Sequence, residues 1–156
     1  MRALSKVDNE SDLTVGLIPA RWNSTRFEGK PLVDISGIPM IKRVYDRACM
    51  AESLDTVVVL TDDERISSYC SKQEIRCIII EEDCATGTDR CAKALELLDG
   101  KIFVNIQGDE PLISPTHIDN VIGEHLKNFN YVIILPSVKC NNIDTPNIVK
   151  VVANNK

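Results

Sequence analysis

The sequence predicts an α/β fold of three layers (αβα), in which helices cover both faces of a mainly parallel, Rossmann-like sheet. Two observations lead to this prediction. Short apolar runs rich in β-branched residues alternate along the chain with amphipathic segments of helical period, and such alternation favours a parallel sheet. The apolar runs are also continuous, which is typical of strands that are covered on both faces.

Five runs fit the strands of such a sheet. They comprise residues 13–20, 56–61, 76–80, 102–107 and 132–135. In open sheets of this kind, ligands bind where loops leave the carboxyl ends of the strands. The loops that follow these runs are therefore where we expect functional residues.

Four segments between the strands have helical patterns, over residues 40–49, 63–72, 88–98 and from Pro115 onward. The third is expected to begin with Thr88 as its N-cap, and the fourth with Ser114 as N-cap and Pro115 at the first helical position. The apolar residues that we expect to share the core-facing sides are Met40, Ile41, Val44, Tyr45, Ala48 and Cys49 in the first helix, Cys91, Ala92, Leu95 and Leu98 in the third, and Ile118, Val121, Ile122 and Leu126 in the fourth.

Composition and charge narrow the functional classes. The 156 residues, 44% hydrophobic and 26% charged, fit one globular domain or a piece of one. We assign residues 1–12 to an N-terminal extension and residues 13–156 to the globular part. Lys and Arg number 18 against 23 Asp and Glu, and this acidic balance disfavours a nucleic-acid partner.

Neither a membrane segment nor a targeting signal is visible. The apolar runs are far shorter than the ~20 residues that a membrane helix needs, and residues 1–14 lack the apolar centre of a signal peptide. We expect a cytoplasmic protein with no membrane partner. The six Cys residues form no C-x-x-C pair, which disfavours zinc and disulfides and favours reduced, mostly buried thiols.

A cationic loop follows the first predicted strand. Residues 19–31 contain Arg21, Arg26 and Lys30 but a single acidic residue, and Ser24 adds a hydroxyl group. Arg holds phosphate oxygens in a bidentate fork, and Lys supplies a point charge. The loop therefore predicts a polyphosphate site, although it matches neither a Walker A loop nor G-x-G-x-x-G.

A second loop, over residues 105–111, follows the fourth predicted strand. It places Gln107, Gly108, Asp109 and Glu110 at the strand end. A carboxylate beside a phosphate loop suits Mg²⁺, which takes one or two carboxylates together with substrate phosphates. Gly108 would let the backbone approach a base or a ribose.

A third loop precedes the helix predicted to start near residue 88. Free N–H groups at a helix start attract an anion or a base carbonyl. Capping by Thr88 and Asp89 is the alternative role. Because capping does not account for Thr86 and Gly87, we expect the two roles to coexist.

Two other features have structural interpretations. Asp62 and Asp63 follow the second predicted strand, where acidic residues commonly stabilise the first turn of a helix. Trp22 lies inside the cationic loop, and it either packs under the loop or lies against a substrate.

Several segments, taken together and in order, carry a resemblance. They are residues 18–21 with 24–26 and 29–33, then 61–66, 87–90, 105–112 and 147–151. In this order they resemble the signature of the 3-deoxy-manno-octulosonate cytidylyltransferase (CMP-Kdo synthetase) family. The resemblance implies a sheet of the nucleotide-diphospho-sugar transferase type.

The resemblance also implies an activity, which is that of a nucleotidyltransferase. CTP and the sugar acid Kdo would give CMP-Kdo and pyrophosphate for lipopolysaccharide synthesis, with Mg²⁺ as cofactor. By position, the implied catalytic residues are Arg21, Lys30 and Asp109, with Asp109 as the metal ligand. The implied nucleotide-binding residues are Ala20, Arg21, Ser24, Arg26, Lys30, Thr86, Gly87, Thr88 and Gln107.

Family members continue beyond the position that matches Lys156, so we expect a cytidylyltransferase domain truncated at its C-terminus. The family forms homodimers, and an uncovered sheet edge predicts self-association of this chain when alone. Two alternative functions stay open. One is a cytidylyltransferase of the sialic-acid type, and the other is a non-catalytic CTP-binding remnant, which the acidic pair Glu81 and Glu82 favours.

Overall fold

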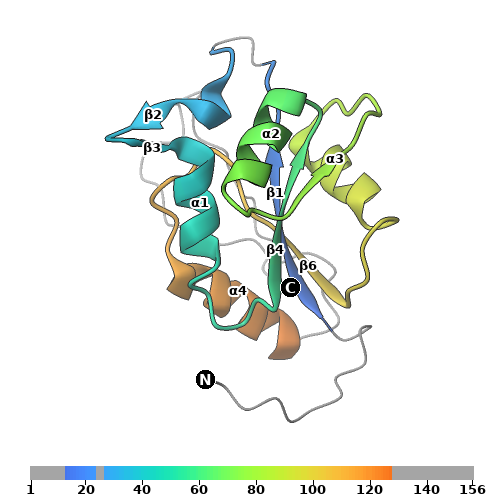
Figure 1. Cartoon of the computed structure of the whole chain (residues 1–156). Coiled ribbons are helices and arrows are strands. Elements are labelled where there is room, and N and C mark those ends of the chain that lie inside the picture. Colours follow the sequence, from blue (N-terminus) through green and yellow to red (C-terminus); the bar gives the residue numbers. More distant parts are fainter. Residues whose placement is uncertain (1–12, 24–26, 128–156) are drawn as a thin grey trace, which may run out of the picture.

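A computed structural model of the chain describes residues 13–23 and 27–127 (Figure 1). The central sheet has four parallel strands in the spatial order β5-β4-β1-β6. They are β1 (Thr14–Ala20), β4 (Thr56–Thr61), β5 (Cys77–Ile79) and β6 (Ile102–Asn105). Each strand lies within a predicted segment, and the fifth predicted strand, over residues 132–135, lies outside the described residues.

Strand β1 runs through the middle of the molecule and is buried on both faces. Ile18 and Ala20 point into one apolar cluster, whereas Val15 and Leu17 point into another. Strand β4 divides its side chains between the same two clusters in the same way. This two-sided burial is the physical reason for the continuous apolar runs in the sequence.

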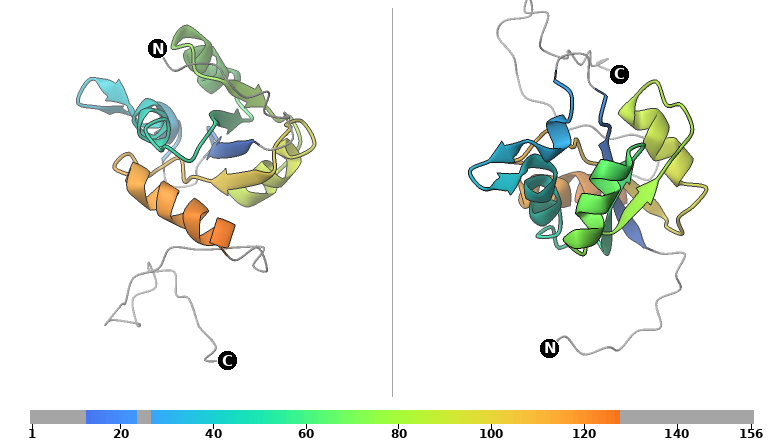
Figure 2. Two further views of the ribbon diagram at one scale, coloured as in Figure 1. Left: turned by 90° about the horizontal axis from the view of Figure 1, so that it is seen from below. Right: turned by 45° about the horizontal axis from the view of Figure 1, so that its top comes forward.

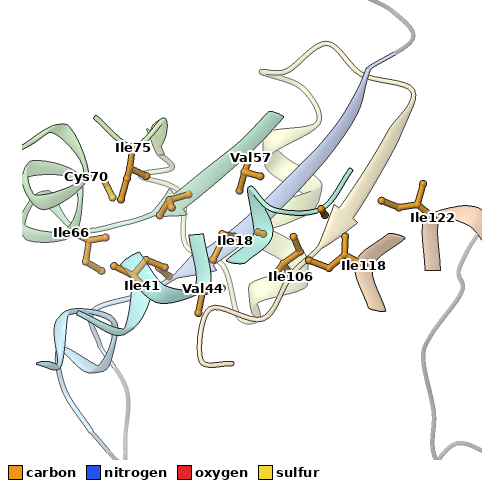
Figure 3. Packing of buried hydrophobic residues seen from close by; sticks show 14 residues of the cluster. Ile18, Ile41, Val44, Val57, Ile66, Cys70, Ile75, Ile106, Ile118 and Ile122 are labelled. Carbon is orange, nitrogen blue, oxygen red and sulfur yellow. The ribbon is translucent and has the colours of Figure 1, made fainter. Parts of the chain in front are cut away.

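Helices cover both faces, which confirms the predicted three-layer fold. Helices α1 (Met40–Ala48), α2 (Glu64–Lys72) and α4 (Pro115–Lys127) cover the first face, and α3 (Gly87–Ala94) covers the second (Figures 1 and 2). Figure 3 shows the first cluster, where Ile41 and Val44 of α1 meet Ile18 of β1 and Ile118 of α4.

Helix α3 differs from its prediction at both ends. Its N-cap is Thr86 rather than Thr88, because Thr86 and Asp89 form a capping box. The helix ends at Ala94, and bonds from the N–H groups of residues 95–97 to carbonyls three residues earlier tighten the following turn. Leu95 and Ala92 are exposed rather than buried, because Cys91 and Ala94 are the residues of α3 that pack in the second cluster.

Two more burial predictions were wrong. Leu126, in the last turn of α4, is 49% exposed, because the buried side of that helix consists of Ile118 and Ile122. Cys49 follows the end of α1 and is exposed. Among the other described cysteines, Cys70 and Cys91 are buried and the rest are half-buried free thiols.

A small hairpin that the sequence analysis did not predict lies beside α1. Its strands, β2 (Asp34–Ile35) and β3 (Ile38–Pro39), have two residues each and are too short to give a periodic pattern. Ser36 and Gly37 form the turn with φ angles of 52° and 84°, as in the type I′ turns that favour hairpins. The Gly37 N–H donates to Asp34 Oδ1 at 2.7 Å.

Candidate functional site

A cleft of about 500 Å³ opens at the carboxyl ends of β1 and β6. It is enclosed by the cationic loop, by the start of α3 and by the loop after β6. The residues that line it are Pro19, Ala20, Arg21, Phe27, Lys30, Pro31, Met40, Cys84, Thr86, Gly87, Arg90, Gln107, Gly108 and Asp109. All three loops selected from the sequence therefore meet at one place, which the parallel strand order brings about.

Lys30 and Asp109 lie in direct contact across this cleft. Lys30 Nζ donates to Asp109 Oδ2 at 2.7 Å. Lys30 belongs to the 3-10 helix η2 (Lys30–Leu32), and Asp109 lies in the loop after β6. The two side chains are 39% and 52% exposed, so both are accessible to a ligand that enters the cleft.

Close backbone packing fixes the loop after β6 against the end of β1. A Cβ atom on Gly108 would lie 2.6 Å from the carbonyl oxygen of Pro19, a separation that no larger residue tolerates without a shift of the backbone. The Ile106 N–H donates to the Leu17 carbonyl at 2.8 Å. Gly108 is therefore required for a tight junction that places Gln107 and Asp109 at the mouth of the cleft.

The start of α3 lies against the same strand end. A Cβ on Gly87 would lie 3.1 Å from Pro19 Cγ. Thr86 Oγ1 accepts from the Asp89 N–H at 3.1 Å, and Asp89 Oδ2 accepts from the Thr86 N–H at 2.8 Å. Capping thus employs Thr86 and Asp89, and Gly87, which lines the cleft, lets the start of α3 pack on Pro19.

The predicted nucleotide-binding residues divide into three groups. Those that line the cleft are Ala20, Arg21, Lys30, Thr86, Gly87 and Gln107, together with Asp109, the predicted metal ligand. Thr88 is absent from the lining, and its hydroxyl lies 3.5 Å from the Asn105 Nδ2 atom that donates to it. Ser24 and Arg26 fall outside the described residues.

Arg90 lines the cleft, but the sequence analysis included it only in segment 87–90 and gave it no role. It is 3% exposed, and its Nη2 donates to Asp62 Oδ2 at 2.6 Å. Its Nη1 lies 3.5 Å from the carbonyl oxygen of Ile80, to which it donates. A buried charge needs such partners, so Arg90 ties the start of α3 to the segments that follow β4 and β5.

The neighbouring acidic residues have structural roles, but only Asp63 has the predicted role at the start of a helix. Asp62 pairs with Arg90. Asp63 is the N-cap of α2 and accepts from the Arg65 N–H at 2.9 Å. The hydrogen bond from the Arg65 side chain is the main cause that holds the pKa of Asp63 below its usual value.

The chemistry of the donor set fits a divalent cation that arrives with a ligand. Within residues 13–23 and 27–127, no group of three or more His, Cys, Asp or Glu side chains could hold a metal ion. Mg²⁺ in phosphate sites commonly takes one or two carboxylates and fills its other positions with phosphate oxygens and water. Asp109 meets that requirement, and Arg21 and Lys30 supply positive charge beside it.

A family model described as cytidylyltransferase matches residues 15–156. The chain belongs to the cytidylyltransferase family. The sequence-based resemblance is thereby confirmed.

Within this family, the chain is similar to relatives that are named 3-deoxy-manno-octulosonate cytidylyltransferases. A mitochondrial 3-deoxy-manno-octulosonate cytidylyltransferase of Arabidopsis thaliana is 54% identical over 110 residues, which cover 69% of this chain and 38% of the relative. One from Syntrophobacter fumaroxidans is 43% identical over 145 residues, which cover 88% of this chain and 58% of the relative. The chain thus spans between about two fifths and three fifths of the length of these relatives.

A solved structure agrees with this comparison. It is that of CMP:2-keto-3-deoxy-manno-octonic acid synthetase in complex with CTP, with a TM-score of 0.73 and 36% identity, over 75% of this chain and 48% of that chain. More distant nucleotidyltransferases, such as one from Methanothermobacter at 15% identity and a TM-score of 0.62, share the fold.

No helix within residues 13–127 that the structure describes has the length and apolarity to cross a membrane.

Proposed function

We propose that the chain binds CTP with Mg²⁺ in this cleft and is the nucleotide-binding part of a 3-deoxy-manno-octulosonate cytidylyltransferase. The observation that carries the proposal is the contact between Lys30 and Asp109 beside Arg21 and Gln107. It combines positive charge for phosphates with a carboxylate for the metal. The named relatives and the CTP complex of the similar synthetase support the same ligand.

The proposed reaction is a nucleotidyl transfer. A hydroxyl oxygen of Kdo attacks the α-phosphorus of CTP, a new oxygen–phosphorus bond forms, and the bond to the β-phosphate oxygen breaks. Pyrophosphate leaves with its electron pair, and the hydroxyl proton passes to solvent. Such a transfer is catalysed mainly by positioning and by stabilising the charge on the phosphate oxygens.

The residues of the cleft have distinct roles in this reaction. Lys30 and Arg21 would bind the triphosphate oxygens and stabilise the charge that develops on the leaving group. Asp109 would hold Mg²⁺, which when bound neutralises phosphate charge. Gln107 and Gly87 would face the nucleoside, where a side-chain amide and a close backbone can recognise a base.

Nucleotide binding requires that the ion pair between Lys30 and Asp109 separates. In the structure the two side chains pair with each other. With CTP and Mg²⁺ bound, Lys30 would pair with phosphate oxygens and Asp109 would hold the metal. Because both side chains are more than one third exposed, separating the pair costs about 0–1 kcal/mol.

The proposal includes the cellular setting that the resemblance implies. The product would be an activated sugar for lipopolysaccharide assembly, made in the cytoplasm by a protein that acts as a homodimer. A second sugar acid is suggested by a Shewanella relative that is 46% identical over 110 residues and is named 8-amino-3,8-dideoxy-manno-octulosonate cytidylyltransferase. The 8-amino sugar is therefore the second candidate substrate.

Two measurements on the 156-residue chain test the proposal. Isothermal titration with CTP, with and without MgCl2, measures binding, and we expect tighter binding with the metal. Pyrophosphate release with CTP and a panel of Kdo, its 8-amino analogue and sialic acid measures catalysis, and we expect the fastest release with Kdo. Binding without release would identify a non-catalytic CTP-binding protein, and absence of CTP binding would refute the proposed site.

A further inference from the structure

The indole of Trp22 lies between the cationic loop and the start of α2. The guanidinium carbon of Arg65 is 3.6 Å from the centroid of the Trp22 ring. The indole Nε1 donates to Glu28 Oε1 at 2.8 Å, and the Gly29 N–H donates to the Trp22 carbonyl at 3.0 Å. Trp22 is thus in contact both with α2 and with the residues immediately before Lys30.

Gly29 fits closely against the Trp22 ring. It has a left-handed φ of 68°, and a Cβ atom there would lie 2.9 Å from Trp22 Cη2. Gly29 is also the N-cap of η2, which begins with Lys30, and the Leu32 N–H donates to the Gly29 carbonyl at 2.9 Å. The backbone that carries Lys30 therefore packs on the indole through the residue that precedes it.

Arg65 is itself held by Asp63. Its Nε donates to Asp63 Oδ1 at 2.8 Å and its Nη2 to Asp63 Oδ2 at 2.7 Å, which is the bidentate fork that fixes a guanidinium plane. Asp63 also caps α2, and α2 packs in the first apolar cluster through Ile66. A continuous series of contacts therefore runs from the core through Arg65 and Trp22 to Lys30.

We propose that Arg65 and Trp22 are positioning residues that hold Lys30 in place for the phosphates of the nucleotide, an inference that rests on the proposed function. Among the described residues that line the cleft, neither Arg65 nor Trp22 is found, so their effect passes through Lys30 and not through contact with the ligand. The stacking of Arg65 on the Trp22 ring also favours the first of the two interpretations of Trp22, which is packing under the loop.

The test combines Arg65→Met with Lys30→Ala in a double-mutant cycle. Arg65→Met keeps an unbranched apolar side chain but removes the guanidinium, with its charge and its fork. Because cation–π pairs contribute roughly three- to tenfold to an equilibrium, we expect Arg65→Met to weaken CTP binding in the presence of MgCl2 by about that factor. In the Lys30→Ala background the same change should alter the dissociation constant less than about twofold, because Arg65 acts through Lys30.

Fluorescence gives a readout that does not depend on the nucleotide, because Trp22 is the one tryptophan in the chain. Arg65→Met should increase quenching of its emission by acrylamide, and Arg65→Lys, which restores a cation, should reverse part of both effects. Arg76→Met is the matched control, since Arg76 is an exposed arginine just before β5, at the amino ends of the strands. It should change neither readout.

Each outcome bears on the inference. If the parent chain binds CTP and Arg65→Met binds it equally well, or weakens binding to the same extent with and without Lys30, the inference is wrong while the proposed function stands. If the parent itself does not bind CTP, the proposed function and the inference both fail. Unchanged quenching in Arg65→Met would refute the stack.

Discussion

We expect the contact between Lys30 and Asp109 to matter little for stability and much for the proposed function. Their ion pair is formed by residues 79 positions apart, and both side chains are more than one third exposed. Exposed pairs of this kind contribute about 0–1 kcal/mol to stability. Because the pair adds so little stability, its place at the mouth of a cleft is better explained by the binding of charged ligands.

The first prediction concerns Lys30→Ala. By analogy with other charge-stabilising donors, its loss should raise the barrier for pyrophosphate release by about 3–4 kcal/mol, a factor of roughly 10²–10³ in rate. The melting temperature should change by no more than about 4 °C, because the pair is exposed. Assays of release and calorimetry on the same preparation measure both.

Lys42→Ala is the control for this prediction. Lys42 also pairs with a carboxylate, Asp46, but within α1, and it is not among the cleft residues. It should keep the parent rate. Equal rates for parent and Lys30→Ala, in a parent that is active, would remove Lys30 from the catalytic assignment.

The second prediction concerns two glycines with opposite surroundings. Gly108→Ala would place a Cβ 2.6 Å from the Pro19 carbonyl oxygen, and the required backbone shift should destabilise the protein by about 1–3 kcal/mol. Gly123→Ala, within α4, meets nothing within 4 Å and should stabilise by up to about 1 kcal/mol through helix propensity. Urea unfolding of the two variants tests whether the signs differ as expected.

At the scale of elements, the parts that the sequence predicted well are those that a buried sheet imposes. Strand β4 needs apolar residues on both faces, so Val57, Val58 and Val59 form a continuous run that has few other interpretations. The hairpin of β2 and β3 has no such run, and the first residue of α3 depends on which of two threonines caps it. Local sequence therefore predicts the strands of the sheet better than it predicts the segments that connect them.

The same distinction applies to the site. Asp109 and Lys30 could be predicted because residues that follow neighbouring parallel strands meet at one edge of the sheet. Arg90 could not, because its role depends on burial against Asp62 and the Ile80 carbonyl, and charged residues are common at exposed positions of a helix. The contact of Trp22 with Arg65 likewise joins a loop to the first turn of α2, and the spacing of the two residues in the sequence gives no signal.

The third prediction concerns the pH dependence of the junction between β4 and α2. The pKa of Asp63 is lowered by its hydrogen bond from Arg65. A carboxyl group with a depressed pKa in the folded state stabilises the protein above its unfolded pKa of about 3.9, and this contribution is lost as the pH falls through the folded pKa. Asp63→Asn retains a good N-cap but has no charge.

We therefore expect the melting temperature of the parent to exceed that of Asp63→Asn near pH 7 and the difference to shrink below about pH 4. Thermal melts followed by circular dichroism between pH 2.5 and 7 measure this difference. A difference that is constant over the whole range would show that the charge of Asp63 does not contribute, and that only its capping oxygen does.

At the scale of the whole molecule, the cleft joins both sides of the sheet. The segment that bears Lys30 packs with α1 on the first face, whereas Gly87 begins α3 on the second, and Figure 2 shows these elements on either side of the strands. A ligand that contacts Lys30, Gly87 and Asp109 at once therefore bridges the two layers of helices. Binding should then stabilise the whole domain and not one loop.

The last prediction follows from this bridging. At a CTP concentration 100 times its dissociation constant, linkage adds about 2.7 kcal/mol to the free energy of unfolding, which for a chain of this size raises the melting temperature by roughly 5–10 °C. MgCl2 alone should give no comparable shift, because one carboxylate that is already paired with Lys30 provides a weak site. Asp109→Asn should keep the shift that CTP gives without metal and lose the additional part that MgCl2 supplies. Two results would mean that the metal binds elsewhere and that Lys30 and Asp109 do not exchange partners on binding. One is a comparable shift with MgCl2 alone, and the other is an unchanged additional shift from MgCl2 in Asp109→Asn.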